Sequence, residues 1–365
     1  MLTNMKNRID TYSLLRVFVA ILIAYTCTIV IIFTFSKVPF TAMHRFFLGP
    51  FATRRGFFNI VEQAIPLVFA GLSLNVIQKG GLINLIADGA LYMGAVIATV
   101  VAISLTLPAG LHAGVAIACA AVVGGLITII PAIIKKYTGT WELVVAIMLN
   151  TVFFYLGQYI INNGYLDEVA GYASFRFQQT ARLGRMISGT QMHYGFYIMI
   201  VVFVLVYILM EKTLFGYKLK IVGVNMRYAK NAGINVFRIV MLSQFIGGCI
   251  AGMGGAVEIL GIYNRFLWVT PVAFVWDAIL INILAGEKTA NIPLTAFFFS
   301  YVRVGAGIMS RGTDLDQEIV AIIQAIIIFL VSAERFMYTY KIKREQKEAL
   351  METEKLLAPR SGGTA

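Results

Sequence analysis

The chain has 365 residues, of which 59% are hydrophobic and 13% are charged. A typical soluble domain is about half apolar and about a quarter charged. This composition excludes an ordinary soluble domain, a disordered chain and a small disulfide scaffold, and it predicts an all-α protein that crosses a membrane many times. The formal net charge is +12. Because the basic residues lie between apolar runs, we interpret them as topology signals rather than as a nucleic-acid surface.

Apolar runs of membrane-spanning length recur along the whole chain. A helix needs about 20 mostly apolar residues to cross the hydrocarbon core. The runs, divided by charged residues, Pro and Gly, predict about ten transmembrane helices. Their ranges are 17–36, 58–77, 82–106, 111–134, 140–162, 194–210, 239–262, 268–286, 290–309 and 317–333. No small-residue cleavage site follows the first run, so we expect it to remain as an anchor.

The distribution of Lys and Arg predicts the orientation of these helices. With the N-terminus inside, the inner segments hold 20 of the 30 basic residues and the outer segments hold nine. Basic residues concentrate on the cytoplasmic side, so both termini are expected there. The first outer loop, with Arg54 and Arg55, departs from this rule. The expected domains are a transmembrane domain over residues 1–335 and a charged cytoplasmic tail over residues 336–365, which reads as a solvated helix.

Two connecting segments are long enough to carry function. The outer segment 163–193 interleaves aromatic residues with Arg176, Arg182 and Arg185. The inner loop 211–238 is basic, and its apolar residues recur near helical spacing. Gly223 interrupts that spacing and Gly233 stops it, which predicts one or two short helices at the cytoplasmic face.

Small residues four apart indicate where helices approach closely. The pairs include Gly248 with Gly252 and Ala120 with Gly124. Small side chains let two helix backbones come together, so these positions predict helix contacts rather than chemistry.

Motifs for catalysis by the chain itself are missing from the sequence. It contains no Walker A phosphate loop, no His-Glu-x-x-His metal motif and no nucleophile elbow. The cysteines lie singly in apolar runs, and neither they nor the histidines have metal-ligand spacing. The protein is therefore expected to bind no metal and not to be an enzyme acting alone. Transport, channel activity and membrane scaffolding remain.

Polar residues inside the predicted spans are the strongest indication of a solute pathway. A charged side chain at the centre of a span costs about 2.5–3.5 kcal/mol on insertion scales. The charged residues are Glu62, Asp88, Glu142, Glu258, Asp277 and Arg303. Asp88 and Asp277 are expected to lie at interrupted helices, either lining a pathway or capping a broken helix. Asn84, Asn150 and Gln244 add hydrogen-bonding groups.

Five stretches, taken in order, resemble one family: the membrane permeases of ABC importers for branched-chain amino acids, simple sugars and nucleosides. They are residues 81–89 (GLINLIADG), 142–150 (ELVVAIMLN), 215–225 (FGYKLKIVGVN), 232–235 (AGIN) and 251–256 (AGMGGA). Asp88 takes the acidic position of the first stretch. The second stretch is most similar to the nucleoside and simple-sugar branch. Residues 274–288 depart from the family pattern, which leaves the solute open.

The resemblance implies roles for particular residues. Those expected along the substrate pathway are Asn84, Asp88, Glu142, Asn150, Trp276 and Asp277. Those expected to couple the loop to an ATPase are Phe215, Gly216, Leu219, Gly223, Asn225, Ala229 and Gly233. Those expected to dock an external binding protein are Arg54, Arg55, Arg176, Arg182 and Arg185.

The resemblance also implies partners and a location. The partners would be a separate ABC ATPase that binds ATP and Mg²⁺, a second permease subunit or copy, and an extracytoplasmic solute-binding protein. This chain would bind no cofactor and would lie in the lipid bilayer of a bacterial plasma membrane. The expected cargo is a nucleoside, a related ribose-containing solute or a simple sugar. Riboflavin, branched-chain amino acids, ion-coupled secondary transport and a non-transporting scaffold stay as alternatives.

Overall fold

The computed structural model describes residues 36–315, except Ile83, Tyr172 and Glu287, and a few residues within 26–34 and 322–326. The chain divides into two units, residues 44–312 and residues 1–43 with 313–365. The predicted crossings at 17–36 and 317–333 lie largely outside the described residues, and the tail 336–365 lies wholly outside them. Ten crossings, cytoplasmic termini and the domain boundary after residue 335 therefore stay predictions.

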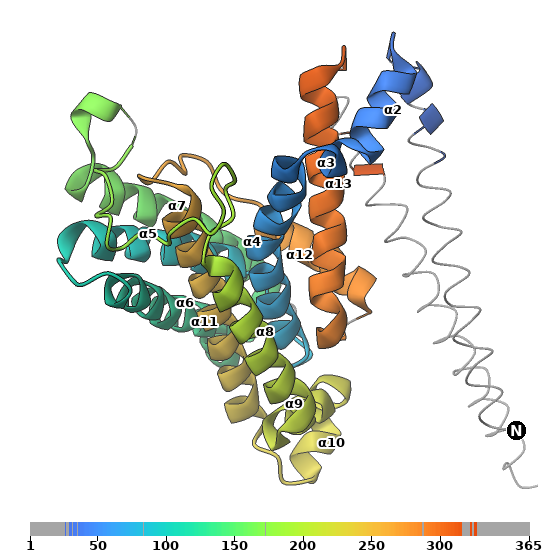
Figure 1. Ribbon diagram of the computed structural model, residues 1–365. Helices are drawn as coiled ribbons and strands as arrows, with labels where there is room; N and C mark the ends of the chain where they lie inside the picture. Colours follow the sequence, from blue (N-terminus) through green and yellow to red (C-terminus); the bar gives the residue numbers. More distant parts are fainter. Residues whose placement is uncertain are drawn as a thin grey trace, which may run out of the picture. The chain divides into compact units, whose positions relative to one another are not determined.

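Helices are the main secondary structure among the described residues of both units. Helix α2 (Pro39–Phe47) runs across the boundary between them. In the smaller unit, the Asp314 carboxylate accepts hydrogen bonds from the Ser36 hydroxyl at 2.8 Å and from the Lys37 backbone N–H at 2.6 Å. The elements of the larger unit are α3 (Gly49–Ala52), α4 (Arg54–Gln78), α5 (Ala87–Ser104), α6 (Leu111–Thr138), α7 (Glu142–Gly164), η1 (Glu168–Ala170), α8 (Gly195–Lys212), α9 (Leu214–Val224), α10 (Met226–Asn231), α11 (Val236–Ile262), α12 (Phe274–Ala285), η2 (Thr289–Asn291) and α13 (Ile292–Gly312) (Figure 1).

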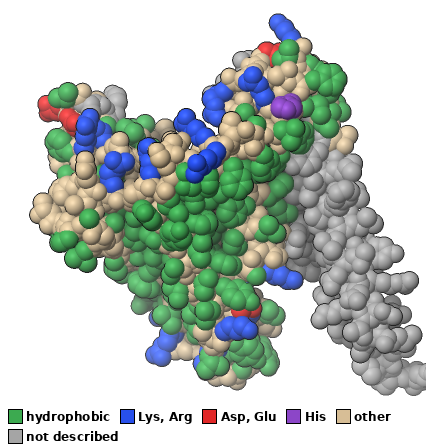
Figure 2. All heavy atoms as spheres, viewed as in Figure 1, with side chains coloured by type: hydrophobic (Ala, Val, Ile, Leu, Met, Phe, Trp, Pro, Cys, Tyr) green, Lys and Arg blue, Asp and Glu red, His purple; other side chains and the backbone are tan. Residues whose placement is uncertain are grey.

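Within the described ranges, seven helical segments are long and apolar enough to cross a membrane. They agree with the predicted crossings that begin at residues 58, 82, 111, 140, 194, 239 and 290. Figure 2 shows hydrophobic side chains in a broad band over the front of this unit, with Lys and Arg gathered above and below it. A band of that kind suits a lipid environment that ends at two polar interfaces.

Helix α11 packs against α4, α5 and α6 at the centre of this unit. Glycines permit these approaches, as the small-residue spacing predicted. A Cβ added at Gly252 would overlap the Ala120 carbonyl oxygen of α6, and one added at Gly255 would overlap the Leu91 carbonyl oxygen of α5. Side chains larger than hydrogen at these two positions would push the helices apart.

The crossing predicted at 268–286 is wrong in extent. Helix α12 has 12 residues, a length of about 18 Å, which is too short for a hydrocarbon core of about 30 Å. Residues 271–273 before it are not helical, and Pro271 lacks a backbone N–H and disfavours helical geometry at the preceding residue. Helix α5 likewise begins at Ala87 rather than at residue 82.

Loop 211–238 contains the two short helices α9 and α10. The break between them falls at Asn225 and not at Gly223, which lies within α9. The Asn225 side chain accepts a hydrogen bond from the Tyr228 backbone N–H at 3.0 Å, so it caps α10 while its own backbone is extended. Gly233, with φ +78°, ends the second helix region in a left-handed turn.

Candidate functional site

Two interrupted helices begin next to each other in the larger unit. Asp88 lies in the first turn of α5 and Asp277 in the first turn of α12. The Asp88 carboxylate lies near the Val275 backbone N–H at the start of α12. A carboxylate is favoured at a helix N-terminus, where the first N–H groups have no partner within the helix. Both acids therefore lie at a junction where the two helix starts meet.

The two acids differ in their partners. Asp277 forms an ion pair with Arg303 of α13, which compensates its charge. Asp88 is half-buried, and its Oδ1 atom has no hydrogen-bond partner among the described residues. A buried acceptor without a partner is costly unless a ligand or water supplies a donor. Of the two acids at this junction, Asp88 is thus the one with an acceptor atom left free.

Asn150 of α7 fastens the start of α5. Its Oδ1 atom accepts the Gly89 backbone N–H at 2.9 Å, and its Nδ2 atom donates to the Leu85 carbonyl oxygen at 3.0 Å. One amide side chain therefore satisfies a free donor of the first helical turn and an acceptor of the connection before it. Because Gly89 and Leu85 lie on either side of Asp88, these two bonds hold the backbone of Asp88 in place at the junction.

Asn84 supports the connection before α5 from the opposite side. It is fully buried, and its Nδ2 atom donates to Gln244 Oε1 of α11 at 2.8 Å. Its Oδ1 atom accepts the Ile86 backbone N–H at 3.0 Å. These bonds satisfy a non-helical backbone inside an apolar bundle, where water is scarce. The structure places Asn84 behind the junction rather than along a cavity.

A cavity of about 290 Å³, called here the aromatic cavity, opens at this junction. Its lining includes Asp88, Asn150 and Trp276 from the predicted pathway residues, joined by Gly89, Tyr92, Ile147, Thr151, Phe154, Tyr155, Pro271 and Val272. Tyr92 is buried, with its ring centroid 4.9 Å from that of Phe154. Tyr155 and Trp276 are exposed. The cavity therefore combines flat aromatic faces with an acid and an amide.

Gln158 of α7 fixes the position of the aromatic wall of the cavity, which is formed by Tyr92, Phe154 and Tyr155. Its Nε2 atom donates to the Tyr92 hydroxyl at 2.7 Å and to the Trp268 carbonyl oxygen at 2.6 Å. The Tyr92 hydroxyl in turn donates to the same carbonyl oxygen at 3.3 Å. The segment before α12 is thereby held against α5 and α7, which keeps the wall in one arrangement.

Glu142 lies elsewhere. It is the first residue of α7, and its Oε2 atom is 3.2 Å from Lys135 Nζ of α6. Eight residues along the same helix separate it from Asn150, which is about 12 Å. The structure brings Asp88, Asn150, Trp276 and Asp277 to one junction, but Asn84 and Glu142 do not line the aromatic cavity.

Loop 211–238 contacts the connection that leads to Asp88. Leu219 and Ala229 are buried, and Phe215 is half-buried. A Cβ added at Gly216 would overlap the Met210 carbonyl oxygen, so α9 packs tightly on the end of α8. Glu211 lies 2.6 Å from Lys220 of α9 and 3.5 Å from Lys79 at the end of α4. The ionic contacts and the packing tie this loop to residues 79–81.

Residues 56–332 match the family model of the permease component of branched-chain amino acid transport systems. The chain belongs to this permease family. It is similar to the guanosine ABC transporter permease protein NupP of Bacillus subtilis, with 29% identity over 75% of this chain and 80% of the relative. It is also similar to the glucose ABC transporter permease protein TsgB13 of Haloferax volcanii (26%, 83% of each chain) and to the nucleoside ABC transporter permease protein NupB of Lactococcus lactis (25%, 89% and 92%).

The basic residues singled out near the other end of the permease are mostly exposed. Arg54 and Arg55 begin α4, and the other three lie on residues 165–194, which follow α7 (Figure 1). That segment is anchored to the end of α11, because Leu183 N–H donates to the Leu260 carbonyl at 3.0 Å and Phe177 N–H to the Asn264 carbonyl at 2.9 Å. Arg176 and Arg185 are exposed, whereas Arg182 is half-buried.

Sequence reasoning missed the aromatic wall of the permease. Tyr92, Phe154 and Tyr155 lie within apolar runs, and aromatic residues make up 13% of the chain. In the sequence, their only link to the site is that they lie close to Asp88 and Asn150 on the same predicted helices. That signal becomes specific only when α5 and α7 are known to pack together.

Proposed function

We propose that this permease is the transmembrane subunit of an ATP-driven importer for nucleosides or related ribose-containing solutes. A separate ABC ATPase binds ATP and Mg²⁺ and supplies the work. A second permease subunit or copy faces this one, and an extracytoplasmic binding protein delivers the solute. The assembly lies in a bacterial plasma membrane, with both termini of this chain in the cytoplasm. The chain itself carries the pathway and performs no hydrolysis.

The chemistry of the aromatic cavity carries the choice of cargo. A nucleoside has a flat base that stacks on aromatic rings and a ribose whose hydroxyls donate hydrogen bonds. Tyr155 and Trp276 offer ring faces at the rim, while the free Asp88 Oδ1 atom accepts a hydrogen bond from a ribose hydroxyl. The volume of about 290 Å³ is close to the lower end of small-molecule sites, about 300–1,000 Å³. Relatives named for guanosine and nucleosides support this choice.

The exposed side of the cavity supports a paired pathway. Tyr155 is 66% exposed and Trp276 is 53% exposed, although both are large aromatic residues at the rim. A second permease subunit that faces α7 and α12 would cover them and close a central route. The solute then passes between two such walls as the subunits alternate between outward and inward states.

The contact between loop 211–238 and residues 79–81 supports a coupling role for the loop. A movement of α9 is passed to the connection before α5, since Lys79 is linked to α9 through Glu211 and Lys220. That connection ends at the Asp88 junction. The ATPase docks on residues 215–233 of this chain. Its movement thereby reaches the aromatic cavity through a short stretch of backbone.

The exposed arginines at the opposite end support docking of the binding protein. Arg176 and Arg185 lie on a segment anchored by backbone hydrogen bonds to α11. A fixed basic surface attracts and orients an acidic partner, and it raises the association rate more than the affinity. The same role is proposed for Arg54, Arg55 and Arg182.

The decisive experiment measures uptake by the co-expressed complex in proteoliposomes that contain ATP. Labelled guanosine is expected to accumulate, unlabelled nucleosides are expected to compete, and ribose and glucose are expected to compete weakly because they have no base to stack. Replacing Trp276 by Leu should raise the KM for guanosine, with Trp141→Leu as a control outside the cavity. Accumulation of glucose without guanosine would reject the nucleoside cargo, and uptake without the ATPase would reject the ABC mechanism.

A further inference from the structure

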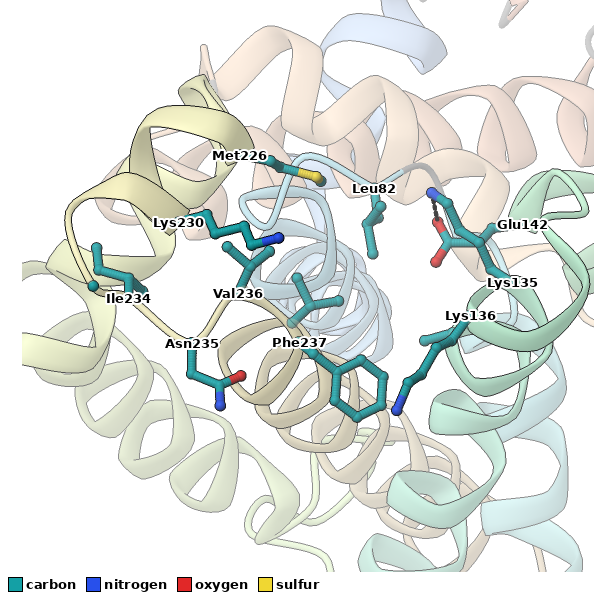
Figure 3. Close-up of a pocket in the computed structure, with 13 residues that line it drawn as sticks. Leu82, Lys135, Lys136, Glu142, Met226, Lys230, Ile234, Asn235, Val236 and Phe237 are labelled. Atoms are coloured by element: carbon teal, nitrogen blue, oxygen red, sulfur yellow. Dashed lines mark hydrogen bonds and ion pairs between the residues drawn. The ribbon is translucent and has the colours of Figure 1, made fainter.

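A second cavity of about 690 Å³ lies between loop 211–238, the end of α6 and the start of α7. We call it the lysine cavity, after Lys135, Lys136 and Lys230 in its lining (Figure 3). We propose that it binds one anionic glycerophospholipid whose headgroup carries hydroxyl groups, such as a phosphatidylglycerol. The site is separate from the aromatic cavity and has no part in the solute pathway proposed above.

The charges of the lysine cavity favour an anionic ligand. Three lysines and a single carboxylate, Glu142, line the cavity, and Lys135 already pairs with that carboxylate at 3.2 Å. Lys136 and Lys230 form no ion pair with a carboxylate in the described part of the chain. Lys136 Nζ instead lies 4.0 Å from the centroid of the Phe237 ring. Two ammonium groups are thus left for a phosphate, and basic pockets between transmembrane helices are suited to lipid headgroups.

Glu142 also identifies a feature of the headgroup. Its side chain is 3% exposed, and its Oε1 atom has no hydrogen-bond partner among the described residues. A buried carboxylate oxygen without a donor is costly, and a hydroxyl group would satisfy it. Lysines that hold a phosphate beside a carboxylate that accepts a hydroxyl match a headgroup with glycerol attached to the phosphate. A bare phosphate has no carbon-linked hydroxyl group beside its charged oxygens.

The remaining walls of the lysine cavity suit acyl chains. Leu82, Ile234 and Val236 line it alongside the lysines (Figure 3). Nearby, Tyr137 is 78% exposed and Trp141 is 62% exposed. Exposed Tyr and Trp residues mark the level of lipid headgroups in membrane proteins. Apolar walls at that level favour a lipid over an acidic peptide of a soluble partner, which would need hydrogen-bonding groups along its whole length.

A lipid in this cavity would contact loop 211–238 on one side and the end of α6 with the start of α7 on the other. Lys230 and Ile234 come from the loop, and Lys135 and Glu142 come from the two helices. The bound headgroup therefore joins two elements that no described ion pair links directly, so it stabilises one position of the loop.

The experiment titrates short-chain phosphatidylglycerol into the full-length chain in neutral detergent and follows thermal unfolding. Phosphatidylglycerol is expected to raise the unfolding midpoint to a plateau. Phosphatidylcholine of equal chain length and soluble glycerol phosphate are expected to have little effect, and phosphatidic acid an intermediate one. The K136Q/K230Q variant should bind phosphatidylglycerol at least about tenfold more weakly. The matched control K212Q/K218Q removes the same charge from exposed sites on α8 and α9 and should bind normally.

Three results would overturn the proposal. One is an equal response to phosphatidylglycerol and phosphatidylcholine in the unaltered chain, which needs no variant to fold. Another is an equal loss of binding in K136Q/K230Q and K212Q/K218Q, which would show a general charge effect. The third is a normal lipid response in K136Q/K230Q together with loss of ATPase co-purification, which would assign the cavity to the ATPase. None of these readouts depends on the transported solute.

Discussion

Gly223 of α9 and Gly81 of the connection before α5 lie backbone against backbone. A Cβ added at Gly81 would stand 3.1 Å from the Cα atom of Gly223, and Gly81 has φ +76°, a conformation that favours glycine. Gly223 in turn lies so close to Lys79 that an added Cβ would overlap its carbonyl oxygen. This contact joins loop 211–238 to the residues that lead to Asp88.

Replacing Gly223 by Ala should separate ATP hydrolysis from transport. The added methyl group pushes α9 away from Lys79, so a movement of the loop no longer reaches α5. We expect ATPase activity of the complex to persist while uptake per ATP falls at least about tenfold, a loss equivalent to about 1.4 kcal/mol. Gly114→Ala on α6, where the added methyl group meets no atom within 4 Å, serves as the control. A normal ratio of uptake to ATP hydrolysed in Gly223→Ala would contradict the proposal that the loop acts on α5 through this contact.

Asp88→Asn should reduce transport without unfolding the protein. The substitution keeps the size of the side chain but removes the charge and replaces one acceptor oxygen by a donor. We expect guanosine uptake to fall about tenfold or more, a loss of at least about 1.4 kcal/mol, with an unchanged thermal unfolding midpoint. Unchanged uptake would remove Asp88 from the pathway. A large loss of stability instead would indicate that Asp88 serves to cap α5.

Asp277→Asn should act mainly on stability. It leaves the Arg303 guanidinium, which is 32% exposed, without its carboxylate partner. Removal of one member of a partly buried pair is expected to cost about 1–3 kcal/mol in the free energy of unfolding. The double variant D277N/R303Q should recover part of that loss, because no unpaired charge remains. Additive losses in the double variant would show that the ion pair does not matter.

The stability of the protein should depend on pH through His193, which lies outside the spanning helices. Burial lowers the pKa of His193 from 6.5 to about 4, and its Nδ1 atom accepts the Gly195 backbone N–H at 3.1 Å. The unfolded chain therefore takes up the proton first. The free energy of unfolding is highest above pH 6.5 and falls as the pH drops toward 4, by up to about 3 kcal/mol. Unfolding in denaturant across this range, with His193→Asn as the variant that loses the slope, checks the prediction.

Most membrane-spanning helices were predictable because a long apolar run has few alternatives in lipid, where each backbone group must be paired within the segment. The run that contains α12 shows the limit of this argument. Residues 268–286 are apolar throughout most of their length, but hydropathy does not distinguish a helix from an extended segment whose backbone groups are paired by neighbours. The hydrogen bond from Gln158 to the Trp268 carbonyl supplies such a partner from another helix.

The candidate site was predictable in part for a similar reason. Asp88, Asn150 and Asp277 stand out because charge and amide groups are expensive in a span. Which of them shares a cavity depends on packing between α5, α7 and α12, and no local pattern contains that information. Asn84 and Glu142 have the same signal in sequence, yet the fold places one behind the junction and the other about 12 Å along α7 from Asn150.

The amino-acid sequence by itself determined that the chain is helical and suited to lipid, that its basic loop contains one or two short helices, and which permease family the chain belongs to. Those properties follow from the order of apolar, basic and glycine residues along the chain. Only the tertiary structure decided that α12 is short, that Asp88 is free whereas Asp277 is paired, and that aromatic side chains from α5, α7 and α12 enclose one cavity. These features arise from contacts between residues far apart in the sequence, where spatial packing supplies the partners.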